Sequence, residues 1–216
     1  QDWEHAECAF HRAQKYGRQV IVEKYIQGSD FRILVVNYKF VAAALRTPAT
    51  ITGDGRHTIR ELIDIANKDP RRGNGHDNIL TEIHADDVCL ELLKKKGYTL
   101  ESVLPQGESL ALKPTANLST GGTATDVTDD VHPQNRSTCE RIARNIGLGV
   151  SGIDVMARNL SQPLRETGGA VLEVNAAPGF RMHLEPTHGQ PRNVAKPVVD
   201  MLFPNKSNGR IPIIVI

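Results

Sequence analysis

Apolar residues recur at helical intervals at the start of the chain and then switch to the pattern of β-strands. The helical pattern stops at Gly17, so it predicts a helix over about residues 4–16. Three apolar runs follow, and they predict strands at residues 20–26, 31–36 and 40–45, with turns at residues 27–30 and 37–39. Together these elements predict an antiparallel sheet that contains a hairpin.

Short amphipathic helices are predicted next, after glycines at 53 and 55 interrupt the strand pattern. Thr58 and Glu61 match a capping box that opens a helix. Its apolar stripe consists of Ile59, Leu62, Ile63 and Ala66. Residues 69–76 form a polar loop without a period, whereas residues 86–96 predict another helix, with acids in its first turn, lysines in its last turn and a glycine directly after it. We therefore expect a helical insertion over about residues 54–104.

Strands and helices alternate in the last part of the chain. Helices are predicted at residues 134–146 and 192–202, and two strands that carry acidic residues lie between them, around residues 153–156 and 172–175. Residues 204–216 have the composition of a linker that leads into one more strand. The expected fold class is α+β, an antiparallel sheet flanked by helices and interrupted by the helical insertion.

The two acidic strands offer candidate metal ligands. Glu173 and Asn175 are two residues apart on one predicted strand, so their side chains point to the same face. Asp154 on the other strand adds a third oxygen donor if the two strands pair, and such hard oxygen ligands suit magnesium. Leu172 and Val174 are expected to point into the core. The alternative is an ordinary solvated sheet face, because short patterns of this kind also arise by accident.

A second group of polar residues could surround a nucleotide. Asp30 and Arg32 alternate to one face at the start of a predicted strand, and Glu23 lies near the end of the strand before it. Acids can accept hydrogen bonds from a ribose, free backbone at residues 24–26 can pair with an adenine edge, and arginines grip phosphate in a bidentate manner. A cross-strand ion pair is the simpler interpretation of Glu23, Asp30 and Arg32. Arg46 is either a second phosphate contact or a charged residue that protects a strand edge.

The loop at residues 117–123 is rich in glycine and small hydroxyl residues, so its backbone N–H groups could approach an anion. It does not follow the order of a P-loop, and no dinucleotide-binding glycine pattern is present. His57 and His183 are the histidines nearest to candidate loops, and each is expected to be a surface or capping residue. Ser151 lacks the context of a Ser-His-Asp triad.

Composition narrows the classes of function. The 216 residues are 39% hydrophobic and 24% charged, as in soluble globular proteins, and 26 basic against 25 acidic residues give a net charge of +1. There is consequently no global charge that would favour nucleic acid or an anionic membrane as partner. Three widely spaced cysteines argue against a disulfide framework and favour a reducing cytoplasm. No apolar run is as long as a membrane span, the start lacks the features of a signal peptide, and both ends are expected to belong to a longer chain.

Several motifs carry a family resemblance. The strings VIVEKYIQGSDFRILVV, NLSTGG, GIDVM and EVNAAPGF, in this order, resemble the C-terminal lobe of ATP-grasp carboxylate-amine ligases. Further strings resemble the cyanophycin synthetase family, and this resemblance covers nearly the whole chain. They are TGDGRHTIREL, DPRRGNGH, SVLPQGE, NLSTGGTATDVTDDVHP, EVNAAPGFRMHLEP and RNVAKPVVDMLFP. The segments TGDGRHTIREL and NLSTGG also resemble the glutathione synthetase part of bifunctional glutathione enzymes, so these two alone do not decide. Residues 208–216 resemble the lead-in to a Mur-ligase-like domain.

The resemblance implies a reaction and its cofactors. A carboxylate would attack the γ-phosphate of ATP in the presence of magnesium, and an amine would then attack the acyl phosphate to form an amide, with release of ADP and phosphate. In cyanophycin synthetases this part adds aspartate to a poly-aspartate backbone, and the full-length enzyme is expected to be a homo-oligomer that acts on amino-acid and peptide-polymer substrates. The N-terminal ATP-grasp lobe has no counterpart before Gln1, so residues 1–203 are expected to be a partial ATP-grasp domain that is inactive alone.

The resemblance also assigns roles to the candidate residues. Asp154, Glu173 and Asn175 would hold magnesium, Glu23 and the backbone of Lys24, Tyr25 and Ile26 would face the adenine, Asp30 the ribose, and the catalytic pair Arg32 and Arg46 the phosphates. Asn117, Ser119, Thr120, Gly121 and Gly122 would hold the reacting carboxylate or acyl phosphate, and Arg181 and His183 would close over the acceptor. A glutathione-synthetase-like ligase and a nucleotide-binding module without catalysis are the alternatives.

Overall fold

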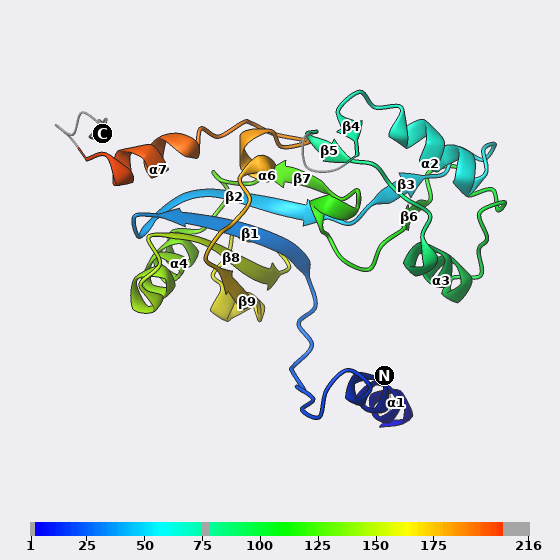
Figure 1. Ribbon diagram of the computed structural model, residues 1–216, viewed down its shortest axis with the longest axis horizontal. Coiled ribbons are helices and arrows are strands. Elements are labelled where there is room, and N and C mark those ends of the chain that lie inside the picture. The colour runs from blue at the N-terminus through cyan, green and yellow to red at the C-terminus, as the bar shows by residue number, and fades with distance from the viewer. Residues whose placement is uncertain (1–2, 75–77, 205–216) are drawn as a thin grey trace, which may run out of the picture.

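A five-stranded antiparallel sheet is the centre of the computed structural model, which describes residues 3–74 and 78–204 (Figure 1). The strand order is β7-β2-β1-β8-β9. Their bounds are Ser29–Val36 for β1, Lys39–Thr47 for β2, Thr123–Asp126 for β7, Val150–Ala157 for β8 and Ala170–Asn175 for β9. The predicted hairpin is confirmed as β1 and β2, and Asn37 and Tyr38 at its tip have positive φ angles of 48° and 59°. Two consecutive positive φ values match the twist of a tight hairpin.

Helices cover both faces of this sheet. The α4 helix, Pro133–Ile146, confirms the helix predicted at 134–146 and packs Cys139 and Ala143 against β-strand residues such as Ile33 and Ile153. The opposite face is covered in part by α6, Arg181–Leu184, and by α7, Ala195–Leu202, on the side away from α4 in Figure 1. The short α5 helix spans Leu164–Thr167 and precedes β9.

The predicted insertion has its own apolar core, and it contains short strands as well as the expected helices. Its helices are α2, Ile59–Asn67, and α3, Asp87–Lys95, which bury apolar residues around Ile59, Leu93 and Leu104. The predicted capping box is confirmed: the hydroxyl of Thr58 accepts from the backbone N–H of Glu61, and the Glu61 carboxylate accepts from that of Thr58. Two small sheets, which the sequence did not reveal, complete the unit. They are the antiparallel pair β3, Thr50–Thr52, with β6, Ser109–Ala111, and the parallel pair β4, Arg72–Gly73, with β5, Leu80–Thr81.

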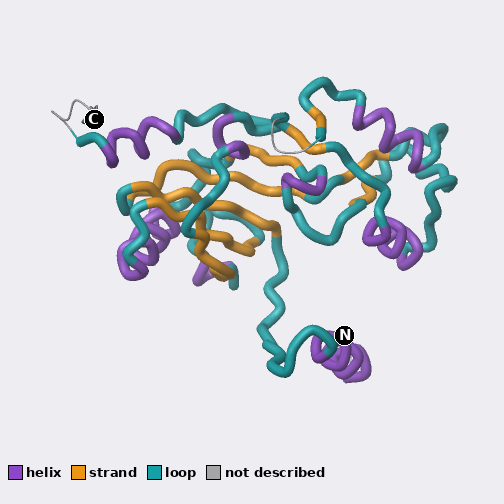
Figure 2. The backbone as a smooth tube through the Cα atoms, viewed as in Figure 1, coloured by secondary structure: helices purple, strands orange, loops and turns teal. Residues whose placement is uncertain are grey.

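The strand predicted at residues 20–26 is wrong. The first helix is confirmed as α1, Trp3–Gln14, but the following segment runs as an extended loop to β1 (Figure 2). Ile21 is 83% exposed and Tyr25 is 74% exposed. The segment has the apolar composition of a strand, yet no other described strand lies beside it to supply hydrogen bonds, and an isolated strand does not form.

The end of the chain agrees in part with the prediction. The last helix begins at Ala195 rather than at Arg192, and Arg192 precedes it as the partner of two carboxylates described below. The linker and strand predicted at residues 204–216 lie outside the described residues, apart from Pro204. Among the helices of the described ranges, none combines the length and apolar character needed to cross a membrane.

Candidate active site

Polar side chains from four neighbouring strands share one face of the central sheet. The strand register pairs Asp30 with Arg46, and Arg32 with Asp154. It also pairs Asp154 with Glu173, and Gly152 with Asn175. Because directly paired residues point to the same face, the six predicted residues of this group form one band across β2, β1, β8 and β9. The predicted metal ligands Asp154, Glu173 and Asn175 are therefore brought together with Asp30, Arg32 and Arg46.

The centre of the band is a buried ion network. Arg32 donates to both carboxylate oxygens of Asp154, the Nη2 contact with Oδ2 being 3.1 Å long. Arg46 donates from Nη2 to Oδ2 of Asp154 at 2.9 Å and from Nε to Oδ1 of Asp30 at 2.9 Å. Both arginines and Asp154 are less than a tenth exposed. Burial alone would lower the pKa of Arg46, but its hydrogen bonds to Asp30 and the charge of Asp154 raise that pKa above the usual value.

Glu173 and Asn175 form the open end of the band. Nδ2 of Asn175 donates to Oε1 of Glu173 at 3.1 Å, and the Glu173 carboxylate is exposed. The prediction that Val174 packs into the core is confirmed, but the same prediction for Leu172 is wrong. A β-bulge pairs Asp154 with Glu173 but Val155 with Val171, so Leu172 is the extra residue and is 55% exposed.

These oxygen donors fit a magnesium ion in part. Glu173 supplies an accessible carboxylate, and the neighbouring amide of Asn175 supplies a carbonyl oxygen, which are ligands that magnesium prefers. Both oxygens of Asp154 are engaged by guanidinium groups, so Asp154 would have to release at least one arginine to bind a metal ion. Across residues 3–74 and 78–204, no three His, Cys, Asp or Glu side chains gather as a metal site. The predicted set contains two carboxylates and one amide.

The loop predicted to hold an anion lies at the end of β2. It forms the 3₁₀ turn η1, Leu118–Thr120, and Gly121 follows with a φ of 90°. The backbone N–H groups of Thr120, Gly121 and Gly122 donate to carbonyls inside the loop. The argument that these N–H groups are free for an anion is consequently wrong for these three residues. The exposed side chains of Asn117 and Ser119 remain available.

The α6 helix brings Arg181 and His183 to the neighbourhood of this loop. Arg181 donates from Nη1 to the Asn78 carbonyl at 2.7 Å and from Nη2 to the Thr81 hydroxyl at 3.4 Å, and both partners belong to the insertion. His183 is only 2% exposed, so the expectation that it is a surface or capping residue is wrong. Neither of its ring nitrogens has a hydrogen-bond partner among the described residues. Burial and the nearby charge of Arg32 lower the pKa of His183 to about 4, so the ring is neutral at pH 7.

His57 and Ser151 behave differently from His183. His57 is exposed and contacts the Asp54 carboxylate through Nδ1 at 2.6 Å, as expected for a surface residue. The hydrogen bond to Asp54 raises the pKa of His57 above its ordinary value. Ser151 is fully buried, and its hydroxyl has no partner in the described part of the chain.

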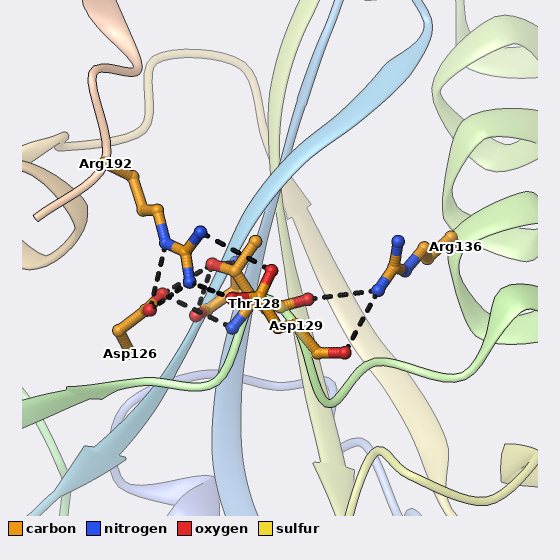
Figure 3. A network of polar contacts seen from close by, with 6 residues as sticks. Asp126, Thr128, Asp129, Arg136 and Arg192 are labelled. Carbon is orange, nitrogen blue, oxygen red and sulfur yellow. Dashed lines mark hydrogen bonds and ion pairs between the residues drawn. The ribbon is translucent and has the colours of Figure 1, made fainter. Parts of the chain in front are cut away.

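A carboxylate clamp holds the segment between α6 and α7 against β7 (Figure 3). Arg192 donates from Nε and Nη2 to Oδ2 of Asp126 at 2.9 Å and 2.6 Å, and from Nη2 to Oδ2 of Asp129 at 2.6 Å. Burial opposes ionisation of Asp126, but the hydrogen bonds from Arg192 and Thr128 lower its pKa. This clamp was not predicted from the sequence, although its two acids lie close together in the string TDVTDD.

Four predicted nucleotide contacts are not brought onto the polar band. Glu23, Lys24 and Tyr25 are exposed and Ile26 is half-buried, all in the extended segment before β1. They make no hydrogen bond or ion pair with the rest of the described chain. The segment joins β1 beside the end of β8, where a Cβ on Gly28 would come within 2.5 Å of the Ala157 backbone.

Comparisons with known proteins identify close relatives of this chain. No protein-family model matches. The chain is 55% identical over 216 residues to the cyanophycin synthetase of Synechocystis sp., and 54% identical to that of Crocosphaera subtropica. Each alignment covers 99% of this chain and 25% of the relative, so the chain spans about a quarter of the length of these curated relatives.

More distant relatives come from glutathione biosynthesis. The bifunctional protein GshAB of Mannheimia succiniciproducens is 34% identical over 87% of this chain and 25% of its own length. The crystal structure of a bifunctional glutathione synthetase from Pasteurella multocida superposes with a TM-score of 0.70 at 32% identity, over 84% of this chain and 24% of that chain. The predicted α+β fold of an ATP-grasp C-terminal lobe is thereby confirmed.

Proposed function

Because this chain corresponds to a quarter of the cyanophycin synthetases, we propose that it is part of an ATP-dependent carboxylate-amine ligase that extends a poly-aspartate backbone. In the proposed reaction a carboxylate oxygen of the acceptor attacks the γ-phosphorus of ATP, and ADP leaves with the electrons of the broken P–O bond. The amine of aspartate then attacks the acyl phosphate, an amide bond forms, and phosphate and a proton are released.

The band of charged residues across four strands is the observation that carries this proposal. Phosphoryl transfer needs little covalent chemistry from a protein, and it depends on positioning and on neutralisation of charge. The band places two arginines beside three carboxylates and an amide, all on rigid strands. Cationic groups for phosphates and oxygen donors for a metal ion are thus supplied by one face.

Each residue of the band has a proposed role. Glu173 and Asn175 would hold magnesium, joined by Asp154 once it releases a guanidinium group. Magnesium, when bound, would offset the negative charge of the triphosphate. Arg32 and Arg46, freed from Asp154 in the same exchange, would bind the phosphates, and Asp30 would accept from the ribose hydroxyls.

Residues outside the band complete the proposed site. Glu23 and the backbone of Lys24, Tyr25 and Ile26 would contact the adenine, because this backbone makes no hydrogen bonds to the described part of the chain. The side chains of the loop at Asn117, Ser119 and Thr120, with Gly121 and Gly122 shaping its backbone, would face the reacting carboxylate. Arg181 and His183 would lie over the acceptor.

The direct test is a substrate screen on the full-length gene product. The enzyme is supplied with ATP, magnesium, a short aspartate-arginine primer and each amino acid in turn, and phosphate release and primer mass are measured. The proposal expects release that requires aspartate, together with a mass increase of one aspartate residue. Release that is indifferent to aspartate would contradict the named substrate.

A glutathione-synthetase-like ligase is the second candidate, supported by relatives that are 30–34% identical over 85–87% of this chain. It differs from the first candidate in its substrates. Activity with γ-glutamylcysteine and glycine, and none with aspartate and the primer, would favour it. Magnesium-independent ATP binding without any turnover would favour a nucleotide-binding module.

A further inference from the structure

A pocket of about 390 Å³ opens on the α4 side of the central sheet, and it takes no part in the proposed reaction. Its apolar residues are Phe31 of β1, Leu45 of β2, and Val127 and Leu160 in the loops that follow β7 and β8. All four belong to the core cluster beneath α4 or pack against it, so the floor of the pocket is part of a packed core. The volume lies within the range of about 300–1,000 Å³ that is typical of small-molecule sites.

Two segments that are fixed to each other form the rim of this pocket. The backbone N–H of His132, at the start of α4, donates to the Leu160 carbonyl at 2.8 Å. Nδ2 of Asn135, a residue that is only 2% exposed, donates to the carbonyls of Leu160 and Gln162 at 3.0 Å and 2.8 Å. Its Oδ1 accepts from the backbone N–H of Leu164 at 3.0 Å. These bonds hold the loop after β8 against α4, so the rim is formed before any ligand binds.

The rim carries one negative and one positive side chain. Asp130 belongs to the loop after β7 and Arg158 to the loop after β8, and both are exposed. Within the described residues neither side chain has an ion-pair or hydrogen-bond partner, and they do not pair with each other. Asn159 also lines the pocket; its Oδ1 accepts from Ser161 and Gln162, whereas its Nδ2 has no partner in the same part of the chain. The pocket therefore offers a carboxylate on one loop and a group of donors on the other.

These groups together specify the chemistry of a ligand. The apolar floor favours contact with an apolar group, Asp130 requires a cation, and Arg158 can bind a carboxylate in a bidentate manner. A phosphate would bring a like charge to Asp130, and a purely apolar molecule would leave both charges unmatched. A free α-amino acid with an apolar side chain supplies an ammonium group, a carboxylate and an apolar group in one molecule.

We propose that this pocket binds a free α-amino acid with an apolar side chain, such as leucine. The ammonium group of the ligand contacts Asp130, its carboxylate contacts Arg158 and Nδ2 of Asn159, and its side chain lies on the apolar floor. The charged band lies on the other face of the sheet. Binding in the pocket therefore goes beyond the proposed function, and it requires neither ATP, nor magnesium, nor turnover.

Calorimetric titration of the full-length protein with leucine, without ATP or magnesium, tests this site. We expect saturable binding by the wild type. Asp130→Asn and Arg158→Gln should each weaken leucine binding roughly fivefold, because one exposed charge pair is lost in each variant. Glu166→Gln and Arg165→Gln are matched controls that each remove one exposed charge from α5, outside the pocket, and they should bind leucine as the wild type does.

Analogues of leucine assign each contact to a residue. N-acetylleucine lacks the ammonium group, so it should bind equally to the wild type and to Asp130→Asn. Leucinamide lacks the carboxylate, so it should bind equally to the wild type and to Arg158→Gln. Glycine lacks an apolar side chain, and it should bind to the wild type at least about tenfold more weakly than leucine does.

Three results would overturn the inference. The first is the absence of saturable leucine binding by the wild type at millimolar concentrations. The second is wild-type leucine affinity in both Asp130→Asn and Arg158→Gln, with thermal melting followed by circular dichroism showing that both are folded, because leucine would then bind elsewhere. The third is competition of leucine with Mg-ATP or with aspartate, which would place leucine in the charged band.

Discussion

Asp154 holds two guanidinium groups from different strands, so this single carboxylate belongs both to the buried ion network and to the proposed metal site. If Asp154 lost its charge, Arg46 would keep Asp30 as its acidic partner, and the buried Arg32 would have no carboxylate partner among the described residues. Glu173, the direct neighbour of Asp154 across β8 and β9, is exposed and has no arginine partner among the described residues. The two acids of the proposed metal site therefore differ in what they do for the fold.

We expect Asp154→Asn to destabilise the protein by roughly 3–5 kcal/mol, the usual cost of removing one partner from a buried ion pair. Glu173→Gln should change the free energy of unfolding by no more than about 0.5 kcal/mol, as for other exposed positions. Urea unfolding followed by circular dichroism measures both. Equal destabilisation by the two variants would contradict the prediction that the buried Asp154 stabilises the fold and the exposed Glu173 does not.

His183 should make stability depend on pH. Its pKa of about 4 in the folded state lies below the ordinary value near 6.5, so the unfolded chain binds the extra proton first. Stability from the neutral ring is complete above about pH 6.5 and falls as the pH drops towards 4, by about 1.4 kcal/mol per pH unit at most. The measurement is the free energy of unfolding at several pH values for the wild type and for His183→Gln. The difference between the two should shrink below pH 6, and a constant difference would contradict the assignment.

At the scale of elements, sequence signals predicted helix starts and ends well wherever these depend only on residues that are neighbours in sequence. The Thr58 capping box fixes the start of α2, and Gly97 follows the end of α3 with a φ of 79°. Elements that depend on distant partners were missed or misplaced. Residues 20–26 have no strand beside them in the part of the chain that the structure describes. The β7 strand forms because β2 offers an edge, and Leu172 is displaced by a bulge that no pattern in the sequence marks.

The same distinction between local and distant contacts separates the site residues that were predicted from those that were not. The spacing of Glu173, Asn175 and Asp154 predicted their common face, because alternation along a strand and pairing of neighbours are simple rules. The burial of His183 and the contact of Arg72 with Gly121 depend on how α6 and the insertion pack, which the sequence alone does not specify.

The packing of the η1 loop gives a prediction for this element. A Cβ on Gly122 would lie 2.7 Å from the Asn117 carbonyl oxygen and 2.8 Å from that of Thr47, and both are backbone atoms that cannot move aside cheaply. Gly122→Ala should therefore displace the loop from the end of β2 and abolish most ligase activity of the full-length enzyme. Gly179→Ala is the control, because nothing lies within 4 Å of its added Cβ. Full activity in Gly122→Ala would show that the loop position is unimportant.

For the whole molecule, the central sheet separates an apolar face, which packs under α4, from a face that carries the proposed site and is called the chemical face. The apolar face includes Phe31 on β1 and Val174 on β9, whereas the chemical face carries the ion network, Glu173 and Asn175. The insertion and the clamped segment after α6 border the chemical face at the β2 and β7 edge (Figure 1). Under the proposed function, this division would let the charged band exchange partners while the core beneath it stays packed.

The central claim is that this charged face binds ATP together with magnesium, and calorimetric titration of the full-length protein with a non-hydrolysable ATP analogue tests it most directly. We expect binding that requires magnesium in the wild type and in Glu166→Gln, an exposed acid on α5 that serves as the matched control. Glu173→Gln should lose the magnesium dependence and at least about tenfold in affinity, equivalent to about 1.4 kcal/mol. Equal, magnesium-independent binding in wild type and Glu173→Gln would contradict the account.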